Sequence, residues 1–295
     1  MKYLQHSLLL ITLLISTTLK PQTLMSSKKT VQQTTIKLDQ QNQTSSHWIN
    51  VWVHGTRLTP KIFFKKFFHV TRGLHKATNL EPSYHHRAIA ECLHTIDQDK
   101  FNLNNFYLFG WSGKLSFEKR KQAAQELCKE LNQLITDYTL EHGVRPKVRV
   151  ITHSHGGNVA LNMALFAQNN ELSLDELVLL ACPVQEATQN LIKHSCFKAI
   201  YSLYSTRDVL QVIDPQGIYF GEYESIDFDN LFSKRQFPQH PKLKQAEIQY
   251  NNRGILHVEF LLIEKLSGFI QHLPHILCML ASHHEADQKI TLQDN

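Results

Sequence analysis

The stretch Lys147-Val-Arg-Val-Ile-Thr-His-Ser-His-Gly-Gly-Asn158 decides the fold of this chain. Its first half is a β-branched, largely apolar run of the kind that forms a buried strand. The residues that follow Asn158 have the apolar content of a buried helix. The sequence therefore predicts a strand over 147–152 and a helix over 155–168, with Ser154 in the sharp turn between them.

The rest of the chain repeats this alternation of short apolar runs and helical stretches. Further strands are predicted over 48–54, 105–110, 176–181, 197–204 and, more weakly, 246–250. Helices are predicted over 117–142, ending at Gly143, and over 258–280, with a kink at Pro274. Nearly continuous apolar strands separated by helices favour an α/β class protein. We expect a mostly parallel central sheet with helices on both faces.

The turn at Ser154 has the chemical features of a nucleophile site. In parallel sheets, ligands bind beyond the carboxyl ends of the strands, where this serine lies. Gly156 and Gly157 leave room for a strained backbone there. The start of the following helix also directs free N–H groups toward a developing negative charge.

The pentapeptide Thr152-His153-Ser154-His155-Gly156 resembles the G-x-S-x-G nucleophile elbow of the α/β-hydrolase family, in particular its lipase- and esterase-like members. The first glycine of that motif is replaced here by Thr152. The resemblance extends over roughly 48–281. It implies the α/β-hydrolase fold and a serine hydrolase that cleaves carboxylic esters through an acyl-enzyme on Ser154.

A second match lies at the end of the first predicted strand. Val51-Trp-Val-His54-Gly55-Thr56 resembles the His-Gly segment that forms half of the family's oxyanion hole. The resemblance implies that the backbone N–H groups of Thr56 and His155 bind the oxyanion. An ordinary strand-ending turn is the alternative interpretation.

A serine nucleophile needs a base and an acid that orients the base, and in this family they follow the serine in the order acid, then histidine. Asp208 follows the fifth predicted strand, and His257 precedes the last long helix, so the resemblance assigns them these roles. Asp214 and His240 are the competing candidates.

Two other functions stay open at this point. The same triad catalyses acyl transfer when an alcohol or a lipid reaches the acyl-enzyme in place of water. A catalytically silent binding module is the second alternative, because Thr152 departs from the motif.

The N-terminal residues predict export. Residues 1–20 carry Lys2 and a short apolar run from Leu8 to Ile15, which suits a signal peptide or an uncleaved membrane anchor. The polar stretch 21–46 is expected to be a flexible linker. The hydrolase domain is predicted over 47–282, followed by a polar tail over 283–295.

A segment over 57–97 is a candidate cover for the site. Within it, residues 57–76 carry six positive charges and a row of aromatic residues, which predicts a basic amphipathic helix. One interpretation is contact with an anionic membrane surface and selection of lipid esters. The other is a helix packed on the sheet with a solvated basic face.

The composition limits the remaining classes of function. A formal net charge of +5 on 295 residues gives no reason to expect nucleic-acid binding. The five cysteines have no metal-ligand spacing and are expected to be buried or half-buried thiols, with a single disulfide as an alternative after export. The 18 histidines include no HExxH motif, so we expect neither a metal nor a cofactor.

Overall fold

The computed structural model describes residues 47–56, 71–167, 172–213, 232–264, 267–282 and 287–293. Within these residues nine strands form one sheet, in the order β2-β3-β1-β4-β5-β6-β7-β8, with β9 paired to β7. The strands are β1 (Trp48–Val53), β2 (Gly73–Lys76), β3 (Phe106–Gly110), β4 (Lys147–His153), β5 (Leu174–Leu180), β6 (Phe197–Tyr204), β7 (Leu243–Tyr250), β8 (Arg253–Gly254) and β9 (Asp287–Leu292). The six strands expected from the sequence are all present.

The centre of the sheet is parallel. Strands β3, β1, β4, β5, β6 and β7 run in one direction, and β9 joins β7 in parallel. The short strands β2 and β8 pair antiparallel with β3 and β7. The carboxyl ends of β1, β4, β5 and β6 therefore lie side by side at one end of the sheet, which we call the catalytic rim.

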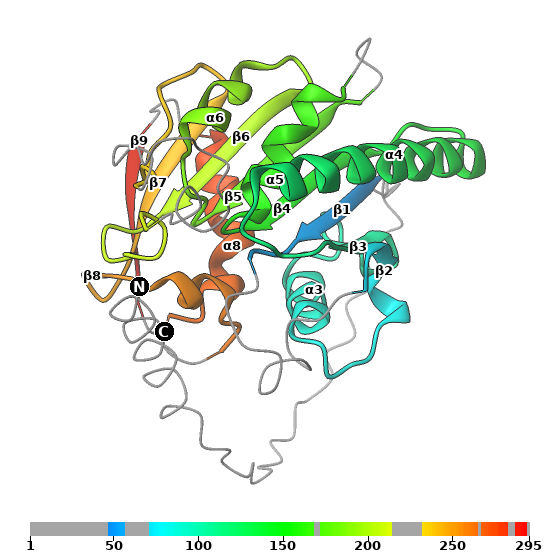
Figure 1. Ribbon diagram of the computed structural model, residues 1–295. Helices are drawn as coiled ribbons and strands as arrows, with labels where there is room; N and C mark the ends of the chain where they lie inside the picture. Colours follow the sequence, from blue (N-terminus) through cyan, green and yellow to red (C-terminus); the bar gives the residue numbers. More distant parts are fainter. Residues whose placement is uncertain are drawn as a thin grey trace, which may run out of the picture. The chain divides into compact units, whose positions relative to one another are not determined.

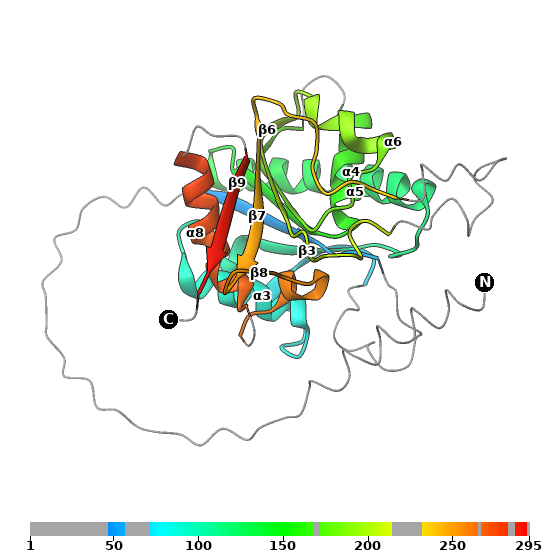
Figure 2. The ribbon, with the colours of Figure 1, turned by 90° about the vertical axis from the view of Figure 1, so that its left-hand side faces the viewer.

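Helices cover both faces of this sheet, as Figures 1 and 2 show. The helices α4 (Phe117–His142), α5 (Gly156–Asn162) and α6 (Glu186–Gln189) lie on one face, and α3 (His85–Ile96) and α8 (Phe269–Ser282) lie on the other. Strand β1 illustrates why two cores result. Ile49, Val51 and Val53 pack in the core under α4 and α5, whereas Trp52 packs in the core under α3 and α8.

The long helix α4 has the predicted bounds because both of its ends carry strong signals. The hydroxyl of Ser116 accepts a hydrogen bond from the backbone N–H of Lys119 and caps the first turn. Gly143 ends the helix in the left-handed conformation, at φ 69°.

The helix predicted over 258–280 is divided in two, which corrects the sequence interpretation. A short 3-10 helix spans His257–Leu261, and α8 begins only at Phe269. Gly268 precedes α8 with φ 48°, a left-handed conformation that interrupts a helical path.

Two other segments contain secondary structure that the sequence did not lead us to expect, in the residues that the structure describes. The segment 283–295, expected to be a polar tail, contributes β9, and Ile290 and Leu292 of that strand enter the core under α8. In the expected cover 57–97, residues 57–70 lie outside the described residues. Residues 73–76 form an edge strand, and α3 is part of the core, where Ile89 and Leu93 are fully buried.

The described part of segment 57–76 forms a strand, where an amphipathic helix was expected. Leu74 packs against the core beside β3, and the backbone N–H of Leu74 donates to the carboxylate of Glu130. The Arg72 guanidinium pairs with Glu126 at 2.9 Å. The described end of this basic segment is therefore a strand held to α4.

All five cysteines are free thiols. Cys128, Cys182 and Cys196 are buried and Cys92 is partly buried, as expected, but Cys278 is exposed on α8. Burial raises the pKa of both Cys128 and Cys196 to about 12. These two buried thiols are thus held in the unreactive, protonated form.

The expected signal peptide or anchor over 1–20 and the linker over 21–46 lie outside the described residues. Among the helices that are described, none combines the length and the apolar character that crossing a bilayer requires.

Candidate active site

The turn between β4 and α5 holds Ser154 in a strained conformation. Ser154 has φ 55°, in the left-handed region that costs a non-glycine residue about 1–2 kcal/mol. Its backbone N–H donates to the carbonyl of Leu180 on β5 at 2.8 Å, and its carbonyl accepts from the N–H of Gly157 at 2.9 Å. These bonds hold the serine at the carboxyl end of β4, as the motif implied.

The two glycines after Ser154 are required by close packing. A Cβ atom on Gly156 would lie 2.4 Å from the carbonyl oxygen of Val53, and one on Gly157 would lie 2.4 Å from Sγ of Cys182. Both distances are far below van der Waals contact. The start of α5 therefore fits between the ends of β1 and β5 only because neither residue has a side chain.

Thr152, which replaces the first glycine of the motif, is accommodated within the sheet. Its side chain is fully buried, and its hydroxyl donates to the carbonyl of Val178 on β5 at 3.0 Å. The β-branched side chain thus has a satisfied polar group. The departure from the family motif does not prevent the turn at Ser154 from forming.

The predicted oxyanion segment lies directly against the serine. A Cβ atom on Gly55 would lie only 2.7 Å from Cβ of Ser154, so the backbone of residue 55 packs against the Ser154 side chain. The Oγ1 atom of Thr56 is buried and has no hydrogen-bond partner among the described residues.

His54 and Trp111 fix the conformation of this segment. Nδ1 of His54 lies 2.7 Å from the carbonyl of Gly55, and Nε2 of His54 accepts from the backbone N–H of Trp111 at 3.3 Å. The indole N–H of Trp111 donates to the carbonyl of His54 at 2.8 Å, and the two rings stack with centroids 5.7 Å apart. Trp111 is buried, and these contacts with His54 hold the predicted oxyanion segment in place.

The predicted acid and base are in contact. Nδ1 of His257 lies 2.7 Å from Oδ2 of Asp208, and both side chains are at least nine-tenths buried. Because a carboxylate only accepts, Nδ1 carries the proton and Nε2 is left as the proton acceptor. The other carboxylate oxygen, Oδ1, accepts the backbone N–H of Gln211 at 3.0 Å.

The loop that carries His257 is held by a buried carboxylate. Glu259 is 1% exposed, and its oxygens accept two bonds from the guanidinium of Arg253, at 2.8 and 3.0 Å. The same carboxylate accepts the backbone N–H of Leu256 at 2.6 Å. The residue before the base is therefore fixed to the β8 hairpin.

Ser154 and His257 are brought to the same rim but are not directly bonded. In the part of the chain that the structure describes, no hydrogen bond joins the Ser154 hydroxyl to the His257 ring. His153, the residue before Ser154, contacts His257 instead: the centroids of their two rings lie 4.6 Å apart. In enzymes without substrate, catalytic hydrogen bonds are often long and tighten only when substrate binds.

The competing candidates are not brought to this site. His240 precedes β7, and its carbonyl accepts the N–H of Leu243 at the first residue of that strand. It therefore lies at the amino end of β7, opposite the catalytic rim. Asp214 lies outside the described residues.

Several histidines near the candidate site are buried and neutral. The pKa values of His86, His153 and His155 all lie well below the ordinary value, first because these rings are fully buried. The charge of Arg120 is the second cause for His155.

These buried rings predict an acid-sensitive fold. Because His86, His153 and His155 stay neutral in the folded state, the unfolded chain binds more protons below its histidine pKa of about 6.5. We expect the free energy of unfolding to be independent of these groups above about pH 7 and to fall as the pH drops below about 6, because the unfolded chain then takes up protons that the three buried rings do not. Urea unfolding at pH 5.0 and 7.5 measures this change. Equal or greater stability at pH 5.0 would contradict it.

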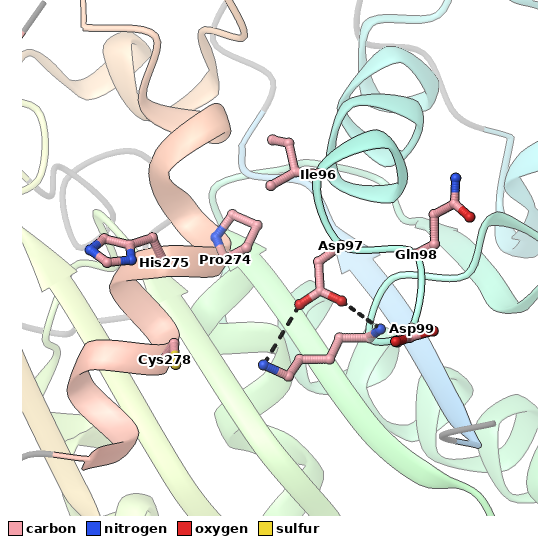
Figure 3. A pocket seen from close by; sticks show the side chains of 8 residues that line it. Ile96, Asp97, Gln98, Asp99, Pro274, His275 and Cys278 are labelled. Atoms are coloured by element: carbon pink, nitrogen blue, oxygen red, sulfur yellow. Dashed lines mark hydrogen bonds and ion pairs between the residues drawn. The ribbon is translucent and has the colours of Figure 1, made fainter. Parts of the chain in front are cut away.

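A hollow lies between the end of α3 and α8. Its volume is about 510 Å³, and Figure 3 shows Pro274, His275 and Cys278 of α8 on one side and Asp97, whose carboxylate contacts Lys100, on the other. Asp97 is paired with Lys100, whose carbonyl accepts from Asn50 near the start of β1. No cluster of three metal-binding side chains occurs among the residues that the structure describes.

Comparison with known proteins gives structural neighbours only. No family model matches the chain, and no curated protein matches it. Phospholipase PlaB from Legionella pneumophila is 20% identical over 46% of this chain, with a TM-score of 0.26, and the chain spans only 25% of that protein. An esterase from Pyrobaculum calidifontis is 12% identical, covering 81% of this chain and 75% of its own, with a TM-score of 0.40. Carboxyl esterase 2 from Tuber melanosporum is also 12% identical, covering 85% and 71%, with a TM-score of 0.34.

The fold follows from the chain's own geometry. A mostly parallel sheet with short antiparallel strands at both ends of its strand order and helices on both faces carries a strained serine between β4 and α5. Aspartate and histidine follow it in the chain and pair at the same rim. The chain has the α/β-hydrolase fold.

Proposed function

We propose that this protein is a serine hydrolase that cleaves carboxylic esters through an acyl-enzyme on Ser154. The observation that carries the proposal is the 2.7 Å contact between Asp208 and His257, which are 49 residues apart in the chain. This contact lies at the rim where the strained turn presents Ser154. An acid–base pair beside a strained serine has the arrangement that nucleophilic catalysis requires.

The reaction proceeds in two halves. The Ser154 oxygen attacks the ester carbonyl carbon while Nε2 of His257 takes the hydroxyl proton, and Asp208 stabilises the resulting imidazolium. The tetrahedral intermediate collapses, and the departing alcohol takes the proton from Nε2. A water molecule then gives its proton to Nε2 and attacks the acyl-enzyme, which releases the acid and restores Ser154.

The oxyanion is stabilised where the carbonyl oxygen develops charge. The backbone N–H groups of Thr56 and His155 act as donors, and the buried Thr56 hydroxyl supplies another. Its lack of a partner among the described residues supports this role. Donors that are fixed before the reaction act most strongly in a water-poor site, and Ser154, His155 and His257 are all buried.

Thr56→Val tests the contribution of this hydroxyl, because valine keeps the shape and removes the donor. We expect kcat for ester hydrolysis to fall on the order of 100-fold with little change in KM. Thr56→Ser, which keeps the hydroxyl, is the matched control and should stay within about threefold of the wild type. Steady-state kinetics on p-nitrophenyl esters measures both. Equal rates for the valine and serine variants would exclude the hydroxyl as a donor.

The substrate class is tested by hydrolysis of p-nitrophenyl esters over a range of acyl chain lengths. We expect turnover of at least one ester and a defined optimum in chain length. If the protein instead releases acyl groups faster when an alcohol is added, acyl transfer is the reaction. If it turns over no ester and reacts with no fluorophosphonate, the proposed function is wrong.

Export of the protein and contact of segment 57–76 with an anionic membrane surface are part of the same proposal. Both rest on the sequence pattern of residues outside the described ranges, apart from 71–76. Neutralising Lys61, Lys65 and Lys66 should weaken binding to anionic liposomes. Unchanged binding would remove the membrane contact from the proposal.

A further inference from the structure

His153, the residue before the nucleophile, joins the two halves of the proposed active site. It is the last residue of β4 and is 6% exposed. Its Nε2 atom lies 3.0 Å from the backbone carbonyl oxygen of His257, 104 residues further along the chain. A carbonyl oxygen only accepts, so Nε2 carries the proton of this ring and donates a hydrogen bond to the backbone of His257.

The other edge of the His153 ring faces the oxyanion segment. A Cβ atom on Gly55 would lie 3.3 Å from Nδ1 of His153 and 3.0 Å from the His153 carbonyl oxygen. The ring is therefore enclosed between Gly55 on one side and the loop of His257 on the other. Burial also lowers the pKa of His153, which keeps the ring neutral and its Nε2–H fixed as the donor.

We propose that His153 is a positioning residue that sets the distance between Ser154 and His257. The inference rests on the proposed function and names one determinant of its rate. Ser154 follows His153 directly in the chain, and the His153 ring holds the backbone of His257 by a hydrogen bond. No direct bond between Ser154 and His257 does so among the described residues. A displacement of about 1 Å between reacting groups lowers a catalytic rate by about 100-fold.

A matched pair of variants separates this role from simple packing. His153→Gln keeps a donor at about the position of Nε2, whereas His153→Met has a similar length and no donor. We expect His153→Met to lower kcat for p-nitrophenyl esters about 100-fold with KM within about twofold of the wild type. His153→Gln should restore kcat to within about tenfold of the wild type. Equal kcat for the two variants would overturn the proposal.

The wild-type protein provides a second test that needs no variant to fold. Nitrogen-15 NMR of histidine-labelled protein distinguishes the two ring tautomers. We expect a neutral His153 ring with its proton on Nε2 and slow exchange of that proton with water from pH 5.5 to 8. A proton on Nδ1 would overturn the proposal. Wild-type protein that hydrolyses no ester would contradict the proposed function instead, and the tautomer would still report the hydrogen bond.

Discussion

Replacing Ser154 with alanine should abolish ester hydrolysis, with a loss in kcat on the order of a million-fold. The loss is this large because the serine, histidine and aspartate act as a unit, so removing the nucleophile removes the whole covalent pathway. Alanine fits the site without new contacts, and the backbone bonds of residue 154 to Leu180 and Gly157 remain. Turnover of a p-nitrophenyl ester measures the effect.

Circular dichroism and the urea unfolding midpoint provide the control on folding for Ser154→Ala. Removing the hydroxyl relieves no strain at φ 55°, so we expect the stability to change by less than about 1 kcal/mol. Ser282→Ala, an exposed serine at the end of α8, is the matched control and should keep full activity. A Ser154→Ala protein that retains a tenth of the wild-type rate would exclude the serine mechanism.

Asp208→Asn should lower kcat about 10,000-fold while the fold stays intact. The structure indicates which way the asparagine side chain turns. Its carbonyl oxygen takes the place of Oδ1 and accepts the N–H of Gln211, which leaves the amide NH₂ facing Nδ1 of His257. The imidazole must then accept at Nδ1 and carry its proton on Nε2, so it no longer takes the proton from Ser154.

The rival carboxylate is the natural control for Asp208→Asn. Asp214→Asn should leave kcat within about twofold of the wild type when measured on the same ester. A large loss in Asp214→Asn together with a small loss in Asp208→Asn would show that the acid has been assigned to the wrong residue.

Local signals in the sequence were sufficient for much of the fold. The bounds of α4 follow from Ser116 and Gly143, and β6 follows from a run of mostly apolar and aromatic residues. The turn at Ser154 was predictable because two glycines follow a buried strand there, and the packing of Gly156 against Val53 gives the physical reason.

Other elements were missed because their signals are weak or depend on distant partners. Strand β9 carries polar residues, and its assignment depends on pairing with β7, about 40 positions earlier in the chain. The expected basic helix over 57–76 ran through Gly73, which adopts φ 94° and begins an edge strand. The helical spacing of the aromatic residues does not indicate that the segment changes to a strand at Gly73.

The candidate site likewise has parts that the sequence predicts and parts that depend on distant residues. The chain order of the family motif pointed to Asp208 and His257. The structure shows that His240 lies at the amino end of β7, whereas His257 lies at the catalytic rim. The link from His153 to His257 joins β4 to a loop more than 100 residues away. No sequence signal local to His153 predicts that contact.

The most direct test of the mechanism is to map a fluorophosphonate label on the wild-type protein by mass spectrometry of its peptides. The probe forms a covalent bond with an activated serine hydroxyl and not with an ordinary one. The mechanism predicts a single phosphonyl group on Ser154, with labelling that is lost in Asp208→Asn. A label on a different serine, or no label on folded protein, would contradict it.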